Sequence, residues 1–238
     1  PTEYRLPDVT YRGQWKLGLG DVKLELRHAL GETDDHTWVW LPASRVLCTG
    51  DLFIWAAPNC GNPQKVQRYV REWAVALDAM RALAPEVLLP GHGPPIVGAA
   101  RCAQALGDTA ALLHTLHDQT VAAMNAGLTL DDVVAAVTVP RDLLERPYLR
   151  PVYDDPAFIV RNVWRRYGGW WDGNPAHLLP PRERALAAEV AALAGGAAAL
   201  VARAEAVAAD DLALACQLAE WAAAAAPDDA GVIAARAA

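Results

Sequence analysis

Three short motifs carry side chains that could bind a metal ion. Gly31-Glu32-Thr33, Gly50-Asp51 and Gly91-His92-Gly93 each follow a run of residues with a strand-like pattern. Carboxylate and imidazole groups suit zinc and other first-row divalent metals, and a catalytic site keeps one position open for water. Loops that follow the strands of an α/β unit meet at one functional edge. Glu32, Asp51 and His92 are therefore predicted to converge there.

The strands that must position these motifs are visible as simple patterns. Apolar and charged residues alternate over 22–27, which predicts a half-buried strand, and short apolar runs at 38–41, 46–48 and 87–89 predict three more. Between the last two, apolar residues recur at helical spacing. Asn62 and Pro63 match an N-cap and a first-turn proline, so we predict a helix beginning there. This order of strand, helix and strand predicts an α/β unit.

Each candidate ligand has an alternative interpretation. Asp34 and Asp35 lie beside Glu32 and could bind a metal in its place, and His36 could orient a ligand carboxylate by a hydrogen bond. Asp51 could simply end a strand in a Gly-Asp turn. His92, between two glycines that let the backbone come close to an ion, is the strongest single candidate.

The order of the motifs resembles that of a known family. His28-Ala29-Leu30-Gly31-Glu32-Thr33, Thr49-Gly50-Asp51 and Pro90-Gly91-His92-Gly93 resemble the second half of the metallo-β-lactamase-fold hydrolases, and glutamate at position 32 is similar to their alkylsulfatase branch. His117-Asp118-Gln119-Thr120, the string from Tyr167 to Pro175 and the helical tail resemble the alkylsulfatase dimerisation domain. The resemblance covers nearly all 238 residues.

The resemblance implies a fold, a reaction and a partner. The fold would be α/β, half of a metallo-β-lactamase αβ/βα sandwich, followed by an all-α helical domain that forms a homodimer. Glu32 and His92 would each complete the shell of a different Zn²⁺ ion, while Asp51 would bridge both ions and serve as the catalytic residue. The reaction would be hydrolysis of ester-type bonds in a small-molecule substrate by a metal-bound hydroxide.

The family's first metal motif, a His-x-His-x-Asp-His cluster, is absent from the chain. We therefore expect an N-terminal metallo-hydrolase half on a separate or missing segment, and we expect this chain alone not to assemble a complete dinuclear site. The alternative is a non-catalytic dimerisation module that retains a remnant metal site.

The segment after Asp51 bears on the substrate. The resemblance implies histidine and arginine there, to contact sulfate, but the segment Asp51–Asn59 is apolar between its two end residues and the first cation is Lys65. This composition argues against specificity for sulfate esters. Phosphate esters, lactones and thioesters remain open as well.

Composition divides the chain near residue 105. Strand, proline and glycine patterns dominate residues 1–105, whereas alanine and leucine dominate 106–238. Alanine-rich stretches at 185–193, 197–208 and 212–225 predict helices separated by Gly195-Gly196 and Asp210-Asp211. These helices form about one pair of a helical repeat, which is too few for an independent solenoid.

Charge and apolar runs exclude several classes of partner. The net charge of −7 argues against binding of nucleic acid, and Arg161, Arg165 and Arg166, the densest basic cluster, are predicted to form a solvated or ion-paired helix face. No apolar run is long enough for a membrane span. The four cysteines show no paired spacing, so a reducing, cytoplasmic location is predicted.

Overall fold

The computed structural model describes residue 3 and residues 5–237. The chain divides into two compact units, Pro1–Gly173 and Asn174–Ala238, which are described separately.

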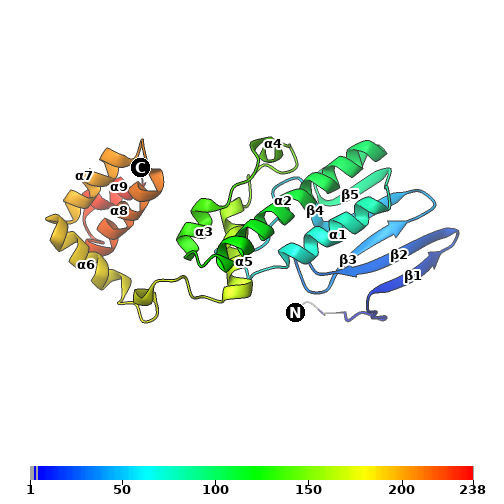
Figure 1. Ribbon diagram of the computed structural model, residues 1–238, viewed down its shortest axis with the longest axis horizontal. Coiled ribbons are helices and arrows are strands. Elements are labelled where there is room, and N and C mark those ends of the chain that lie inside the picture. Colours follow the sequence, from blue (N-terminus) through cyan, green and yellow to red (C-terminus); the bar gives the residue numbers. More distant parts are fainter. Residues whose placement is uncertain (1–2, 4, 238) are drawn as a thin grey trace. The chain divides into compact units, whose positions relative to one another are not determined.

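The first unit contains a mixed sheet (Figure 1). Its described strands follow the order of the sequence: β1 (Gln14–Leu19), β2 (Val22–Ala29), β3 (His36–Leu41), β4 (Val46–Ile54), β5 (Val87–His92) and β6 (Ile96–Val97). Neighbouring strands are antiparallel except for β4 and β5, which are parallel. A parallel pair needs a crossover, and helix α1 (Val70–Ala82) provides it. The carboxyl ends of β4 and β5 therefore lie side by side.

Helices α1 and α2 (Ala99–Asn125) cover one face of this sheet (Figure 1). The strand residues on that face are buried: Trp38, Trp40, Leu47 and Leu88. They pack with helix side chains such as Leu77 and Leu113 into one apolar core. The remaining helices of the unit are α3 (Leu130–Ala136), α4 (Arg141–Leu144) and α5 (Pro156–Gly168).

The opposite face of the sheet is apolar but only partly buried. Paired residues of adjacent strands share a face, so the register defines rows across the sheet. One row crosses five strands and consists of Trp15, Leu26, Val39, Cys48 and Leu89. All of these side chains keep contact with solvent in the described chain.

The second unit is helical. It contains a short 3₁₀ turn (Pro175–His177) and helices α6 (Glu183–Ala194), α7 (Ala197–Val207), α8 (Leu212–Ala225) and α9 (Ala230–Ala237). Gly195 and Gly196, both at positive φ, separate α6 from α7. The three helices predicted from the alanine-rich stretches are confirmed.

Two features differ from the sequence predictions. The crossover helix begins at Val70 and not at Pro63. The Asn62 carbonyl accepts a hydrogen bond from the Lys65 amide, which turns the chain, and the Arg68 amide donates to Asn162 Oδ1 of α5. The division predicted near residue 105 falls inside α2, whereas the structure divides at 173. Helices α2 and α5 bury their apolar faces in the same core as the sheet, which makes them part of the first unit.

The described helices include no single one that is both long and apolar enough to cross a membrane, although the bent pair α6 and α7 together meets the length and composition criteria.

Candidate functional site

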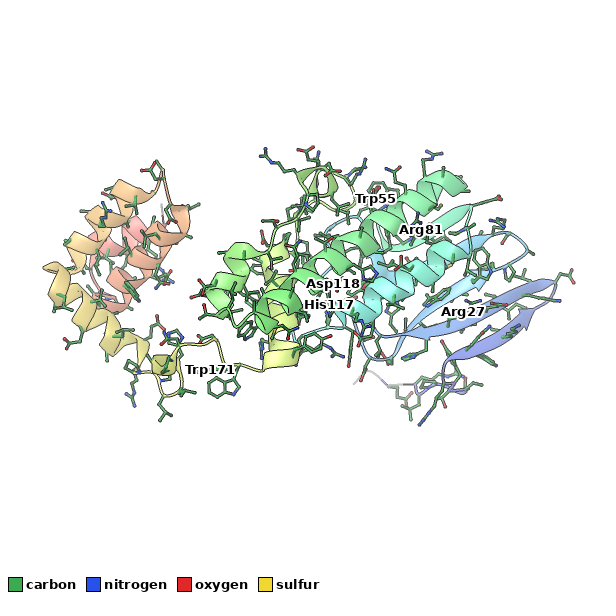
Figure 2. All side chains as sticks on the ribbon, in the orientation of Figure 1. Arg27, Trp55, Arg81, His117, Asp118 and Trp171 are labelled. Atoms are coloured by element: carbon green, nitrogen blue, oxygen red, sulfur yellow. The ribbon has the colours of Figure 1, made fainter. Side chains whose placement is uncertain are left out.

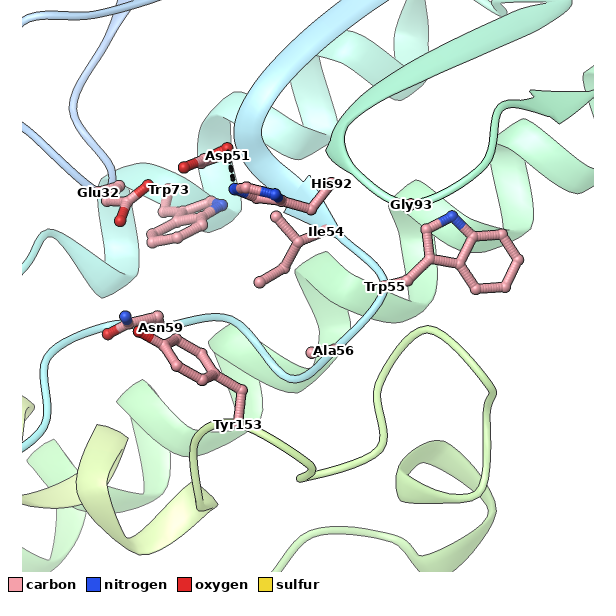
Figure 3. Close-up of a pocket in the computed structure, with 10 residues that line it drawn as sticks. All are labelled: Glu32, Asp51, Ile54, Trp55, Ala56, Asn59, Trp73, His92, Gly93 and Tyr153. Atoms are coloured by element: carbon pink, nitrogen blue, oxygen red, sulfur yellow. Dashed lines mark ion pairs between the residues drawn. The ribbon is translucent and has the colours of Figure 1, made fainter.

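The structure brings the three predicted ligands together at one edge of the sheet (Figure 3). Asp51 lies in β4 beside an irregular stretch of the ladder, and His92 is the last residue of β5. Asp51 Oδ1 and His92 Nε2 are 3.5 Å apart. Glu32, in the turn between β2 and β3, is within hydrogen-bonding reach of Asp51. The predicted convergence of the three motifs therefore agrees with the geometry.

Glycine at position 91 permits this close approach. A Cβ atom built at Gly91 would lie 2.0 Å from Asp51 Oδ1 and 2.8 Å from the Asp51 amide nitrogen. No side chain fits in that space without movement of the backbone. Strand β5 therefore reaches Asp51 only because residue 91 is glycine.

The hydrogen-bonding partner of the His36 side chain in the described residues is the backbone of the neighbouring strand. The His36 Nε2 atom lies 3.0 Å from the carbonyl oxygen of Thr49, and a Cβ atom at Gly50 would come within 2.8 Å of the same nitrogen. The hypothesis that His36 orients a ligand carboxylate is therefore replaced by a contact with the backbone of β4.

Arg68 is a buried cation at the site that sequence reasoning missed. Its Nη1 atom donates to the carbonyl oxygen of Asn59 at 2.6 Å and forms an ion pair with Glu32 Oε1 at 2.7 Å. The sequence assigned Arg68 to the interior of a helix, whereas it lies in the loop that precedes α1. Gly61 and Pro63 were the signal for that loop, since both favour turns.

Burial and crowding raise the pKa of Glu32. Removal of the carboxyl from solvent is the main cause, and its hydrogen bond with Asp51 raises the pKa further. The positive charge of Arg68 opposes both effects. Two adjacent carboxyl groups repel each other when both are ionised, and a bound cation relieves that repulsion.

The three side chains line a pocket of about 390 Å³. Its polar end holds Glu32, Asp51 and His92, and Asn59 and Tyr153 face them from the other side (Figure 3). The other lining groups include Ile54, Trp55 and Trp73, so the pocket combines a polar end with apolar walls. Such a combination is typical of sites for small molecules.

The alternative ligands lie elsewhere. Asp34 and Asp35 line a different pocket together with His28, whose Nε2 atom contacts the Asp34 carbonyl oxygen at 2.8 Å. Glu32, and neither aspartate, is thus the carboxylate of this turn that lines the pocket with Asp51 and His92.

The chemistry of the donors fits a divalent metal, because two carboxylates and an imidazole share one pocket and one of the carboxylates has a raised pKa. Within residue 3 and residues 5–237, however, no three His, Cys, Asp or Glu side chains are grouped closely enough to hold a single ion. The idea that one ion is held by Glu32, Asp51 and His92 together gains no support from this geometry.

The two helical histidines of α2 have structural partners. His114 pairs with Asp78 at 2.9 Å. His117 lies between Asp118, at 2.8 Å, and the hydroxyl of Tyr167, at 3.1 Å, and both His117 and Asp118 are on α2 (Figure 2).

Comparison with known proteins identifies the family. Residues 1–92 match the model of the metallo-β-lactamase superfamily, and residues 129–238 match that of the alkyl sulfatase dimerisation domain. The chain belongs to the alkylsulfatase branch of the metallo-β-lactamase superfamily. The resemblance that the motifs indicated is thus confirmed, as is the α/β region followed by helices.

Relatives of this alkylsulfatase-branch chain include two Pseudomonas enzymes. A linear primary-alkylsulfatase is 32% identical over 197 residues, which cover 80% of this chain and 37% of the relative. An (R)-specific secondary-alkylsulfatase is 33% identical over 67% of this chain and 25% of its own length. The solved structure of a stereoselective inverting sec-alkylsulfatase from Pseudomonas superposes with a TM-score of 0.88 at 29% identity, over 98% of this chain and 38% of that one. The chain therefore spans well under half the length of these relatives.

Proposed function

We propose that this chain supplies part of the dinuclear zinc site of a hydrolase that cleaves ester-type bonds. In the proposed site, Glu32 and His92 would each bind a different ion, and Asp51 would bridge the two ions. A zinc ion bound there would supply a hydroxide nucleophile at neutral pH. The observation that carries this proposal is the convergence of Asp51 and His92, 3.5 Å apart, with Glu32 in the same pocket.

The residues of the chain have separate tasks in this proposal. Asp51, in the irregular stretch of β4, and His92, at the end of the parallel strand β5, present an oxygen and a nitrogen to the pocket. Arg68 holds Glu32 at the same edge by an ion pair and is itself held by the Asn59 carbonyl. Trp73, which donates to the Leu52 carbonyl at 2.8 Å, forms a fixed apolar wall that excludes water.

The apolar walls suit an ester with an alkyl group. The expectation that sulfate esters are disfavoured rested on the lack of a cation before Lys65. Arg68 brings a positive charge to Glu32 from further along the chain. Alkyl sulfates are the substrates named for the two relatives, and we propose an alkyl sulfate as the first substrate to assay.

The half-exposed apolar face of the sheet supports the proposal of a second layer. The row from Trp15 to Leu89 is continuous across five strands, and in the described part of the chain each of its side chains keeps contact with solvent. Sheets with an apolar face need a packed layer on it. We propose that an N-terminal metallo-hydrolase half, on a separate or missing segment, covers this face and supplies the other metal ligands.

The helical unit is proposed to form a homodimer. Five large apolar side chains of its helices are exposed: Leu186, Leu193, Leu212, Leu214 and Ile233. Leu193 is 89% exposed, and burial of such side chains against a second copy would be favourable.

Zinc binding and hydrolysis test the proposal. Equilibrium dialysis with zinc should show binding that is lost in Asp51→Asn and retained in Asp34→Asn, a matched control from the neighbouring pocket. Hydrolysis of dodecyl sulfate, a phosphate monoester, a lactone and a thioester should be assayed after the N-terminal half is added. If Asp51→Asn and Asp34→Asn bind zinc equally well, Asp51 is not a metal ligand. If neither zinc binding nor hydrolysis is found, the non-catalytic dimerisation module is the better description.

A further inference from the structure

A second pocket in the first unit lies outside the candidate metal site. It has a volume of about 210 Å³ and is formed by the loop before α1 and by one face of α5. Three cationic side chains line it, Lys65 from the loop and Arg161 and Arg165 from the helix. It shares no lining residue with the pocket of Asp51 and His92.

The charge of this pocket is not balanced by the described chain. Arg166 pairs with Glu72 at 3.2 Å and stacks on the ring of Tyr69. Among the ion pairs of residues 5–237, in contrast, none involves Lys65, Arg161 or Arg165. Of the three arginines predicted to form an ion-paired or solvated face, Arg166 is therefore ion-paired, and Arg161 and Arg165 are not.

The two unpaired arginines are held close together. Arg161 and Arg165 are four residues apart on α5, which places them on the same side of the helix. Like charges at this spacing repel each other. No acidic side chain lines the pocket, although the whole protein carries a net charge of −7. An anion between the arginines would remove the repulsion.

The floor of the pocket is formed by a buried, hydrogen-bonded side chain. Asn162, which is 4% exposed, accepts from the Arg68 amide at 3.0 Å and donates to the Arg68 carbonyl at 3.1 Å. Gly61 has φ +108°, and a Cβ atom there would lie 2.9 Å from Asn162 Oδ1. The loop thus packs directly on α5, so the cations of the two elements border a shaped cavity.

We propose that this pocket binds a small oxyanion such as sulfate or phosphate between Lys65, Arg161 and Arg165. Guanidinium groups donate paired hydrogen bonds to such oxygens, and the lysine ammonium adds a point charge. The ligand joins the loop to α5. The same loop carries Arg68 to Glu32, so the bound anion stabilises the loop on which Glu32 depends.

Calorimetric titration of the full 238-residue chain tests the site. The protein is first treated with chelator so that a metal ion cannot bind the anion. Sodium sulfate is then titrated at constant ionic strength, with sodium chloride as the reference. The double variant Arg161→Gln, Arg165→Gln should bind sulfate at least about tenfold more weakly, since both charged donors are lost. Arg71→Gln, an exposed arginine of α1 outside the pocket, should bind as the parent chain does.

Two titration outcomes would contradict the oxyanion site. Equal affinity of the parent chain and the double variant would overturn the proposal, as would an absence of heat in the parent chain. Phosphate and hexyl sulfate, titrated in parallel, distinguish the source of the oxyanion. Similar affinities for sulfate and phosphate support a site for free anions, whereas tighter binding of hexyl sulfate supports a site for the head group of an ester.

Hydrogen exchange tests the link to the loop. Sulfate should slow exchange of the amides of residues 59–68 in the parent chain and in Arg71→Gln, and should leave the double variant unchanged. Unchanged exchange in the parent chain at saturating sulfate would overturn the stabilisation of the loop. This result is independent of zinc binding and of hydrolysis, so its failure is distinguishable from failure of the proposed function.

Discussion

The two units of the chain bury very different side chains. The core of the first unit contains large residues such as Trp73, Phe53 and Leu88, packed between a sheet and two long helices. The core of the second unit is built on Ala191, Leu200, Ala222 and Val232, and several of its leucines face solvent. Tight packing of large groups fixes neighbouring side chains, whereas small cores contribute less free energy on folding. The first unit is therefore suited to position a site, and the second to contribute a surface.

Truncation of the largest buried side chain of the first unit should have the greatest effect. Trp73→Ala removes an indole that is 1% exposed and its hydrogen bond to Leu52, so we expect a loss of about 4 kcal/mol in the free energy of unfolding. Urea denaturation measures the change. Trp170→Ala, at a side chain that is 70% exposed, should change it by less than about 0.5 kcal/mol. Equal losses would contradict the description of this core.

Removal of the buried cation Arg68 should cause the second-largest loss of stability. Arg68→Leu leaves Glu32 and the Asn59 carbonyl without their partner, and we expect a loss of about 3 kcal/mol in the free energy of unfolding at pH 7. Arg68→Lys should recover part of it. A loss below that of the exposed control Arg71→Gln would show that the ion pair is not structural.

The same variant has a characteristic dependence on pH. The pKa of Glu32 is raised in the folded chain, so its contribution to stability is fully present below the pKa of the unfolded chain and is lost as pH rises through the folded value. Arg68 opposes this rise, so in Arg68→Leu the decline should extend to higher pH. Urea midpoints between about pH 4 and pH 8, measured without metal, test the direction. A decline that ends at lower pH in the variant would contradict the assigned effect of Arg68.

Truncation of a core side chain in the helical unit should reduce the free energy of unfolding by less than either change in the first unit. Leu200→Ala removes one of the few large buried side chains there, and we expect a loss of about 2 kcal/mol. Hydrogen exchange should show the loss in residues 183–237 and leave the sheet unchanged. Faster exchange in the sheet would show that the two units unfold together.

The smallest effect on stability, with the clearest effect on assembly, is expected at an exposed leucine. Leu193→Glu places a charge on the surface proposed for the homodimer and should change protomer stability by less than about 0.5 kcal/mol. Analytical ultracentrifugation should show a shift from dimer to monomer. Glu189→Gln, at an exposed position one turn away, is the control, and dimers in both variants would place the interface elsewhere.

The sequence predicted those features of the fold and of the site that depend on periodicity and short motifs. Strands β2 to β5, the three alanine-rich helices of the second unit, and the convergence of Glu32, Asp51 and His92 all depend on local patterns or on the geometry of a parallel pair. The apolar spacing of 66–83 could not show that the chain turns until residue 69. That turn depends on contacts with Asn162, which lies far away in the sequence. Arg68 was missed for the same reason, since its role depends on tertiary contacts.

The absence of a side chain at residue 91 has a consequence for the thermodynamics of ligand binding. Because the backbone of β5 is in contact with Asp51, two hydrogen-bonded strands set the distance between the backbones of residues 51 and 92 before a ligand arrives. No backbone torsion of the two strands then has to be ordered on binding, and the entropic penalty of capture is confined to the two side chains.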